Sequence, residues 1–173
     1  MLVAPYLDTL LLLLVAAAAI NDLSSRRIPN LLLLGGLAGA LGLHAISSNP
    51  GTALLGSLGG ALTGLLIFMP FYLVRGMAAG DVKMMATVGA FTGPAAALQI
   101  AILAWCAGGL MALAFLLYRG RLGLALTNLW GIVKPALLRL PAAPVAERQS
   151  AGSMPYGLAI AAGTIYLLIG RYA

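Results

Sequence analysis

The stretch MMATVGAFTGPAAALQIAILAWCAGGLMALAFLLY, residues 84–118, contains 35 residues and no charged side chain. A helix rises about 1.5 Å per residue, so this stretch would extend roughly 52 Å as one helix, whereas a bilayer core is about 30 Å thick. Gly93-Pro94 supplies a break, because proline lacks a backbone N–H and disfavours helix in the residue before it. The stretch therefore predicts two membrane spans.

Four further apolar stretches lie at about residues 3–20, 31–46, 53–74 and 154–170. Hydrophobic residues make up 62% of the 173 residues and charged residues only 8%, whereas soluble proteins carry about 25% charged residues. This composition excludes an ordinary soluble domain. We expect an all-α polytopic membrane protein, a single domain over residues 1–173 built as a bundle of six transmembrane helices. GxxxG pairs such as Gly60/Gly64 favour close packing of these helices.

The basic residues predict how the spans are oriented. No Lys or Arg precedes Arg26, so the first apolar stretch is interpreted as a mature span and not as a signal peptide, which begins with a basic region. With the N-terminus outside, the loops 21–30, 75–83 and 119–153 share one side and hold nine of the ten Lys and Arg residues. Basic residues mark cytoplasmic loops. Both termini are therefore predicted to lie outside.

The net charge of +6 does not indicate a nucleic-acid partner, because the basic residues are separated by apolar runs and form no cluster for phosphates. The expected surroundings are the lipid bilayer. Residues 121–140 mix apolar and basic side chains, and we interpret them as a cytoplasmic amphipathic helix at the membrane interface. A seventh span is the alternative for this segment. Residues 141–153 are predicted to be a flexible linker from their Pro, Ala, Ser and Gly content.

The chain has four acidic residues and one histidine, so the candidates for chemistry form a short set. Glu147 lies in the predicted linker, Asp8 near the outer end of the first span, and His44 near the outer end of the second. His44 is interpreted as a packing or interface residue, and the single cysteine, Cys106, excludes an intramolecular disulfide and a CxxC zinc site. No metal or other cofactor is expected. Asp22 and Asp81 remain.

Asp22 and Asp81 both lie at the predicted cytoplasmic boundary, where a carboxylate is a functional hypothesis. Structural roles are the alternative: Asp22 pairs with Arg26 one turn later, and Asp81 caps a helix. From Asp81 to Thr92 a helix is roughly 18 Å long, so Asp81 is expected below the membrane surface, in a recess. Two neighbouring carboxylates share one proton, as in aspartic proteases. One activates a water molecule while the other protonates the scissile carbonyl oxygen.

These motifs resemble those of the type IV prepilin peptidase family, membrane aspartic proteases of the GxGD class. The resemblance rests on three segments: Asp22-Leu23-Ser24-Ser25-Arg26-Arg27-Ile28-Pro29-Asn30, Gly80-Asp81-Val82-Lys83 and Pro155-Tyr156-Gly157. It implies that Asp22 and Asp81 are the catalytic pair. It further implies that Gly80 permits close approach of substrate, and that Pro29 occupies a first-turn position of the second span, beside Asn30.

For the other motif residues the resemblance leaves two roles open. Lys83 and Arg26 either tune the carboxylates or contact lipid phosphates. Pro155-Tyr156-Gly157 positions the substrate or, alternatively, only starts the last helix with an interfacial tyrosine. One position departs from the family pattern: Ala78 stands where the family's first motif glycine is found, and a positive φ there would be strained.

The resemblance implies a peptidase in the bacterial inner membrane, with its active site facing the cytoplasm. Its substrate would be a prepilin, with a basic leader followed by an apolar helix, and the pilus assembly machinery is a further candidate partner. The chain lacks the cysteine-rich methylating domain of long family members, so it resembles the short form of tight-adherence (Flp) pilus systems. Two other functions stay open: a proton-coupled membrane transporter, and a non-catalytic scaffold of a secretion machine.

Overall fold

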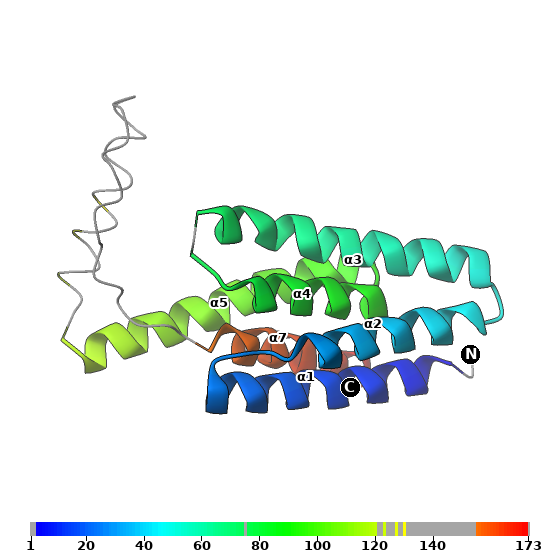
Figure 1. Cartoon of the computed structure of the whole chain (residues 1–173), viewed down its shortest axis with the longest axis horizontal. Helices are drawn as coiled ribbons and strands as arrows, with labels where there is room; N and C mark the ends of the chain where they lie inside the picture. Colours follow the sequence, from blue (N-terminus) through cyan, green and yellow to red (C-terminus); the bar gives the residue numbers. More distant parts are fainter. Residues whose placement is uncertain are drawn as a thin grey trace, which may run out of the picture. The chain divides into compact units, whose positions relative to one another are not determined.

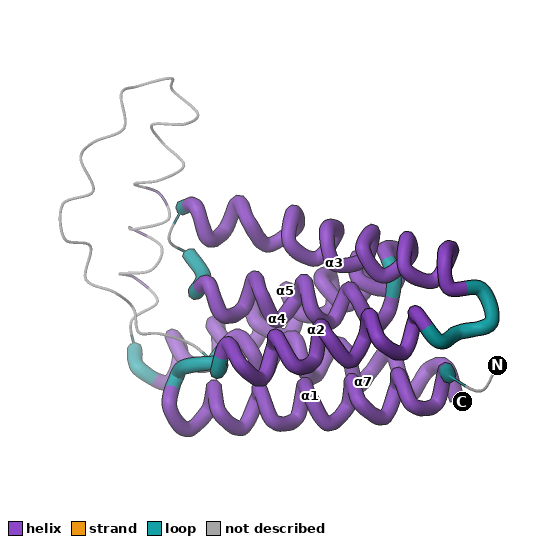
Figure 2. Tube along the Cα trace, turned by 45° about the vertical axis from the view of Figure 1, so that its right-hand side comes forward, coloured by secondary structure: helices purple, strands orange, loops and turns teal. Residues whose placement is uncertain are grey.

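The computed structural model describes residues 3–74, 76–120, 123, 127, 130 and 155–172. These residues form helices and connecting turns, with no strand among them. The helices are α1 (Ala4–Ser25), α2 (Asn30–Ala45), α3 (Pro50–Leu73), α4 (Ala79–Thr92), α5 (Pro94–Tyr118) and α7 (Tyr156–Tyr172), shown in Figures 1 and 2. The predicted all-α class is therefore confirmed for this part of the chain, and each predicted apolar stretch contains a helix.

Three of the helices, α1, α3 and α5, are long and apolar enough to cross a membrane, with 22, 24 and 25 residues. The helix α2 is a shorter apolar helix of 16 residues. The predicted amphipathic helix at 121–140 and the linker at 141–153 lie, apart from three single residues, outside the described part of the chain.

The chain divides into two compact units. The first comprises residues Met1–Gly108 and Pro155–Ala173, and the second comprises Gly109–Met154. In the second unit, α5 continues to Tyr118, and the guanidinium of Arg119 lies 4.3 Å from the centroid of the Phe115 ring. In the first unit, the end of α1 and the starts of α2, α4 and α7 lie at one end, and the two chain termini lie at the other (Figures 1 and 2).

The turn at Gly93-Pro94 separates α4 from α5, as predicted. Gly93 has a φ of 80°, a backbone conformation that glycine adopts readily. Pro94 has no N–H to donate to the carbonyl of Ala90, one turn earlier. The His44 Nε2 atom of α2 lies 3.1 Å from that carbonyl oxygen and supplies the donor. His44 is thus a packing residue, as predicted, and it satisfies the carbonyl that the proline leaves open.

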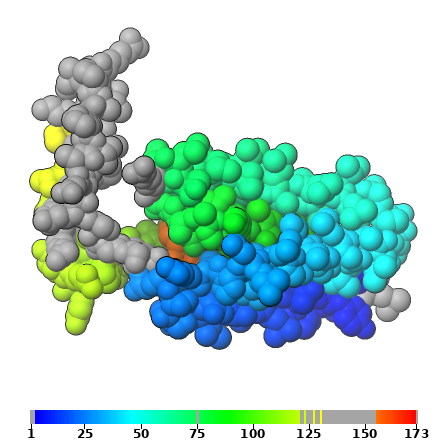
Figure 3. Space-filling view, viewed as in Figure 1, coloured from blue at the N-terminus to red at the C-terminus, as the bar shows by residue number. Residues whose placement is uncertain are grey.

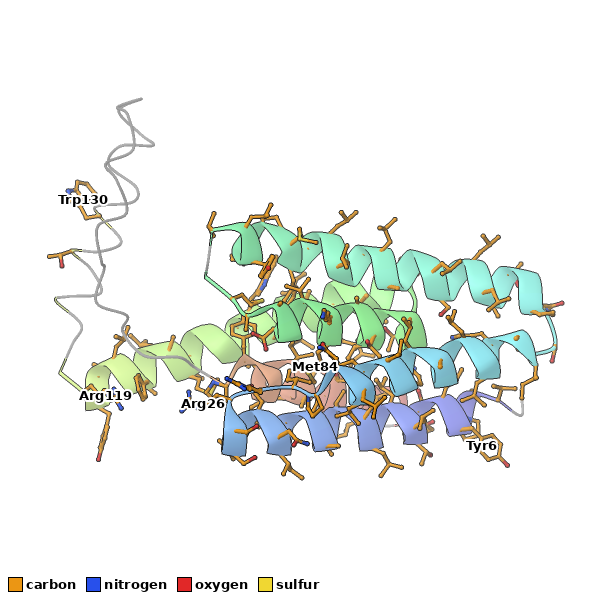
Figure 4. The ribbon with its side chains drawn as sticks, in the orientation of Figure 1. Tyr6, Arg26, Met84, Arg119 and Trp130 are labelled. Carbon is orange, nitrogen blue, oxygen red and sulfur yellow. The ribbon has the colours of Figure 1, made fainter. Side chains whose placement is uncertain are left out.

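The short helix α4 forms the centre of the first unit. Nine of its 14 residues are buried, and it contacts α1, α2, α3 and α7. The closest approach is to α3: a Cβ atom on Gly60 would collide with the carbonyl of Gly89, and one on Gly64 with the carbonyl of Met85. The predicted role of Gly60/Gly64 in helix packing is therefore confirmed. Figure 4 shows Met84 in the middle of this arrangement.

Candidate active site

Asp22 lies in the last turn of α1, where its side chain is buried with 6% of the residue exposed. Its Oδ2 atom accepts a hydrogen bond of 2.8 Å from the backbone N–H of Gly157. Gly157 belongs to the first turn of α7, whose N–H groups have no partner within their own helix. The N-terminus of a helix favours a negative charge. The fold therefore brings Asp22 to the Pro155-Tyr156-Gly157 motif.

Asp81 lies in the first turn of α4 and is 5% exposed. Its Oδ2 atom accepts the N–H of Ala78 at 3.2 Å, and its own N–H donates to the Ala78 carbonyl at 3.1 Å. This is the helix-capping geometry expected of a purely structural aspartate. The two buried carboxylates therefore lie at the same end of the first unit, where α1 ends and α4 begins (Figures 1 and 2).

Arg26 ends α1 in the left-handed conformation, with φ 54° and ψ 29°. Among the described residues it is the one non-glycine with a positive φ, and this conformation costs about 1–2 kcal/mol for residues with a Cβ atom. Its N–H donates to the Asp22 carbonyl at 3.0 Å, and its side-chain charge acts on the Asp22 carboxylate. Figure 4 shows Arg26 at this end of α1. The predicted proximity of Arg26 and Asp22 is therefore present.

Ile28 packs between the two motif glycines. A Cβ atom on Gly80 would lie 3.5 Å from the Ile28 Cβ atom, and a Cβ atom on Gly157 would lie 3.2 Å from its Cδ1 atom. Ile28 therefore joins the loop after α1 to the starts of α4 and α7. Its role is not predicted by the sequence, where the one available signal is an apolar residue inside the polar loop of residues 24–30.

Lys83 and Asn30 meet on another side of α4. The Lys83 Nζ atom donates to the Asn30 Oδ1 atom at 3.0 Å, across 53 residues of sequence. Lys83 follows Asp81 by two positions, so the two side chains leave the helix on roughly opposite sides. Pro29 is the residue before α2, with φ −61° and ψ 128°. The prediction that it occupies the first turn is wrong by one position, because α2 begins at Asn30.

The Asn30–Lys83 bond lies beside an apolar groove of about 860 Å³ between α2 and α3. Leucines of α2 and α3 form its sides, and Ala86 and Thr87 of α4 form its floor. Figure 3 shows atoms of α4 at the surface between those of α2 and α3. The groove thus lies on the side of α4 that carries Lys83.

Tyr156 packs in an aromatic cluster next to the carboxylates. Its ring forms an edge-to-face pair with Phe68 at a centroid distance of 6.0 Å, and Phe68 stacks on Trp105 at 6.2 Å. A Cβ atom on Gly108 would lie 2.6 Å from the Tyr156 ring, so this glycine makes room for the ring. Tyr156 directly precedes Gly157, whose N–H donates to Asp22, so its ring lies close to this carboxylate. The contributions of Phe68 and Trp105 are not predicted by the sequence.

Comparison with known protein families decides the identity of this arrangement. The model of the type IV leader peptidase family matches residues 9–113. The chain belongs to the type IV leader peptidase family. No match is found among curated proteins or among solved structures.

The family match includes Asp22, Asp81 and the residues around them, but it ends before α7. The structure nevertheless places Gly157 of α7 against Asp22. In this leader peptidase family member, the helix outside the matched region thus completes the surroundings of a residue inside it.

The leader peptidase motif around Asp81 contains Ala78, which has φ −80° and ψ 151°. These are extended values that any residue adopts, so the alanine is not strained here. Gly80 is helical, and a Cβ atom there would make only ordinary contacts. In this conformation neither backbone geometry nor space requires glycine at position 80.

The remaining ionisable candidates lie elsewhere. Asp8 forms an ion pair with Arg171 at 3.1 Å, at the opposite end of α1 from Asp22. Glu147 lies outside the described residues. Within the described part of the chain, no three His, Cys, Asp or Glu side chains are grouped as a metal site would require. The arrangement offers two buried carboxylates, and such a pair can share a proton and activate water.

Proposed function

We propose that this family member is an aspartic endopeptidase that cleaves the leader peptide of prepilins, with Asp22 and Asp81 as its catalytic pair. The observation that carries the proposal is that two carboxylates from separate motifs are both buried at the end of the first unit where α1 ends and α4 begins (Figure 1), and that Ile28 packs beside both Gly80 and Gly157. A purely structural cap has no need of a second buried carboxylate. The family membership supports the general activity of a leader peptidase.

In the proposed mechanism, the two carboxyl groups share one proton. The N–H groups of Gly157 and Ala78 fix the Oδ2 atoms of Asp22 and Asp81, and we assign the Oδ1 atoms to the reaction. The ionised carboxylate takes a proton from a water molecule, which attacks the scissile carbonyl carbon. The protonated carboxyl donates its proton to the carbonyl oxygen. The tetrahedral intermediate then collapses, and a proton passes to the leaving amine.

The proposed topology has six spans, with both termini outside and the site facing the cytoplasm. It is supported by the distribution of Lys and Arg, nine of which fall in the three loops assigned to one side. The helix α4 has 14 residues, or about 21 Å of rise, which is shorter than a bilayer core of about 30 Å. If its Thr92 end reaches the outer surface, Asp81 lies below the cytoplasmic surface.

A prepilin suits a site at this depth. Its basic leader would stay in the cytoplasm and its apolar helix in the bilayer, which places the bond between them near Asp81. We assign the chain to the bacterial inner membrane as a peptidase domain of the tight-adherence type, with residues 121–140 as an interfacial helix. Arg26 and Pro29 shape the site directly, whereas Lys83 and Asn30 act from the other side of α4, where their hydrogen bond joins α4 to the start of α2. Gly80 gives substrate access to the site, and Pro155, Tyr156 and Gly157 position the substrate.

The test is to coexpress a Flp-type prepilin with Asp22→Asn and with Asp81→Asn, and to follow the pilin by immunoblot. Each substitution keeps the size of the side chain and removes its charge. We expect the prepilin to remain unprocessed with either variant present at normal level in the membrane. Glu147→Gln, which removes an acid from the predicted linker, serves as the matched control and should process normally. Normal processing by either aspartate variant would exclude the proposed catalytic pair and favour a scaffold.

A further inference from the structure

The antiparallel helices α1 and α7 are joined by hydrogen bonds at both of their ends. At one end, the Gly157 N–H donates to Asp22. At the other, Asp8 accepts from the Arg171 guanidinium at 3.1 Å and from the Tyr172 hydroxyl at 2.7 Å. Fourteen positions separate Asp8 from Asp22, and fourteen separate Gly157 from Arg171. The two joined ends therefore lie about 21 Å apart along both helices.

Between these ends the two helices share an apolar seam. We assign to it Leu11, Val15 and Ala18 of α1 and Ala161, Thr164 and Leu168 of α7, which are all buried on two helices in contact. With both ends fixed, residue 11 lies opposite 168, 15 opposite 164, and 18 opposite 161. The spacing alternates between three and four positions on each helix, which is the pattern of a coiled-coil interface.

The seam itself contains little that distinguishes one register from another. The Thr164 hydroxyl donates within its own helix to the Ile160 carbonyl at 2.8 Å. Among the described side chains, no hydrogen bond crosses between α1 and α7 except at the two ends. A displacement of α7 by three positions that brings Ala161 opposite Val15 would again place aliphatic residues against each other. It would bring Ile165 opposite Leu11 and Leu158 opposite Ala18. It would, however, remove the Gly157 N–H from Asp22.

A polar contact is the usual means by which paired helices select one register. We propose that the Asp8–Arg171 pair, with Tyr172, sets the axial register of α7 against α1 and thereby holds the Gly157 N–H at Asp22. Asp8 and Arg171 are positioning residues in this scheme. They affect the site at a distance, because α1 and α7 are rigid helices packed along their length, so fixing one end fixes the other. The inference rests on the proposed function only in that Asp22 is taken as catalytic.

A role in stability alone does not explain the pattern of contacts at Asp8. The side chains of Arg171 and Asp8 are 39% and 15% exposed, so the protein encloses the pair only in part. Two different side chains of α7 donate to the two carboxylate oxygens of Asp8. Two such contacts fix the position of α7 along α1 more closely than one would.

The first measurement is kinetic and uses the purified full-length protein in detergent with a prepilin substrate. Asp8→Asn and Arg171→Met should lower kcat roughly ten- to hundredfold, because a misplacement of about 1 Å at an active site can cost ~10²-fold. KM should rise as well, because the displaced α7 begins beside Pro155, Tyr156 and Gly157, to which substrate positioning is assigned. Arg171→Lys and the exchange Asp8→Arg with Arg171→Asp should restore most of kcat. Arg119→Met, which removes an arginine of the second unit, is the control and should leave kcat unchanged.

The second measurement reports the register without any activity. In a Cys106→Ser background, Val15→Cys is paired with Thr164→Cys for the observed register, or with Ala161→Cys for a register displaced by three positions. We expect the Thr164→Cys pair to form its disulfide faster when Asp8 is present. Asp8→Asn should shift disulfide formation toward the Ala161→Cys pair.

The outcomes separate this inference from the proposed function. Unchanged disulfide preference and unchanged kcat in Asp8→Asn would overturn the register role and leave the catalytic pair untouched. A loss of folded protein with normal kcat per folded molecule would also overturn it, because the pair would then serve stability alone. Processing by Asp22→Asn would overturn the proposed function, while the disulfide preference would still decide the register.

Discussion

The backbone N–H of Gly157 lies 2.8 Å from the Oδ2 atom of Asp22, across 135 residues of sequence. This contact joins the first motif of the chain to its last helix. It leaves Gly157 without room for a side chain, because a Cβ atom there would lie 2.9 Å from the Asp22 Oδ2 atom and 3.2 Å from the Ile28 Cδ1 atom. The position of Asp22 is thus determined by a residue that the family match does not include.

Gly157→Ala is therefore expected to displace Asp22 and to slow prepilin cleavage, roughly ten- to hundredfold, since small misplacements at a site carry costs of this size. The measurement is the cleavage rate per folded molecule. Gly170→Ala is the matched control in the same helix, because a Cβ atom there would meet nothing within 4 Å. Equal rates for the two variants would contradict the role assigned to Gly157.

Gly60→Ala should destabilise the contact between α3 and α4, because the new methyl group would collide with the Gly89 backbone. Overpacking of this kind costs about 1–3 kcal/mol, or more where backbone must move. Thermal unfolding in detergent measures it. Gly56→Ala, one turn earlier on a side with nothing within 4 Å, should unfold like the wild type, and a comparable loss in both variants would argue against this packing.

His44→Ala should leave the Ala90 carbonyl without the donor that now lies 3.1 Å away. A part-buried carbonyl that loses its partner costs about 1–3 kcal/mol, so the melting temperature should fall while activity per folded molecule stays normal. His44→Gln retains an N–H donor and is expected to recover part of the loss. A selective loss of activity in His44→Ala would instead give the histidine a part in the reaction.

Ala78→Gly restores the glycine of the family motif, and we expect almost no effect. At φ −80° and ψ 151° alanine and glycine are both unstrained, so the cleavage rate should stay within about twofold, since no backbone strain is relieved. The rate is measured beside that of the wild type. A large gain in rate would show that the catalytic conformation uses a positive φ at this position.

Local chemistry explains why several features are predictable from the sequence. The break at Gly93-Pro94 follows from the missing N–H of proline, and it occurs where predicted. The start of α4 near Asp81 follows from the preference of an acidic side chain for the first turn of a helix. The close contact at Gly60 and Gly64 follows from the need for small residues where helices meet. Pro29 is displaced by one position because proline is tolerated both before a helix and in its first turn, so its type alone does not select between them.

Other features depend on which helices become neighbours. Ile28 between Gly80 and Gly157, Asn30 against Lys83, and Tyr156 beside Phe68 all join residues that are distant in sequence. Apolar helices of similar composition can pair in many ways, and their hydropathy does not specify the partner. These contacts arise from shape, where glycines such as Gly108 make room for a ring.

The sequence by itself indicated a lipid environment and the approximate positions of the helices. It also reduced the catalytic candidates to two aspartates, because only 8% of the residues are charged. The tertiary structure alone decided that Gly157 of α7 meets Asp22, that Asp81 lies at the same end of the first unit (Figure 1), and that Asp8 meets Arg171. The physical reason is that the hydropathy of a segment depends only on its own residues and does not specify which other segment it packs against. The axial register of two helices, by contrast, is set by contacts between segments.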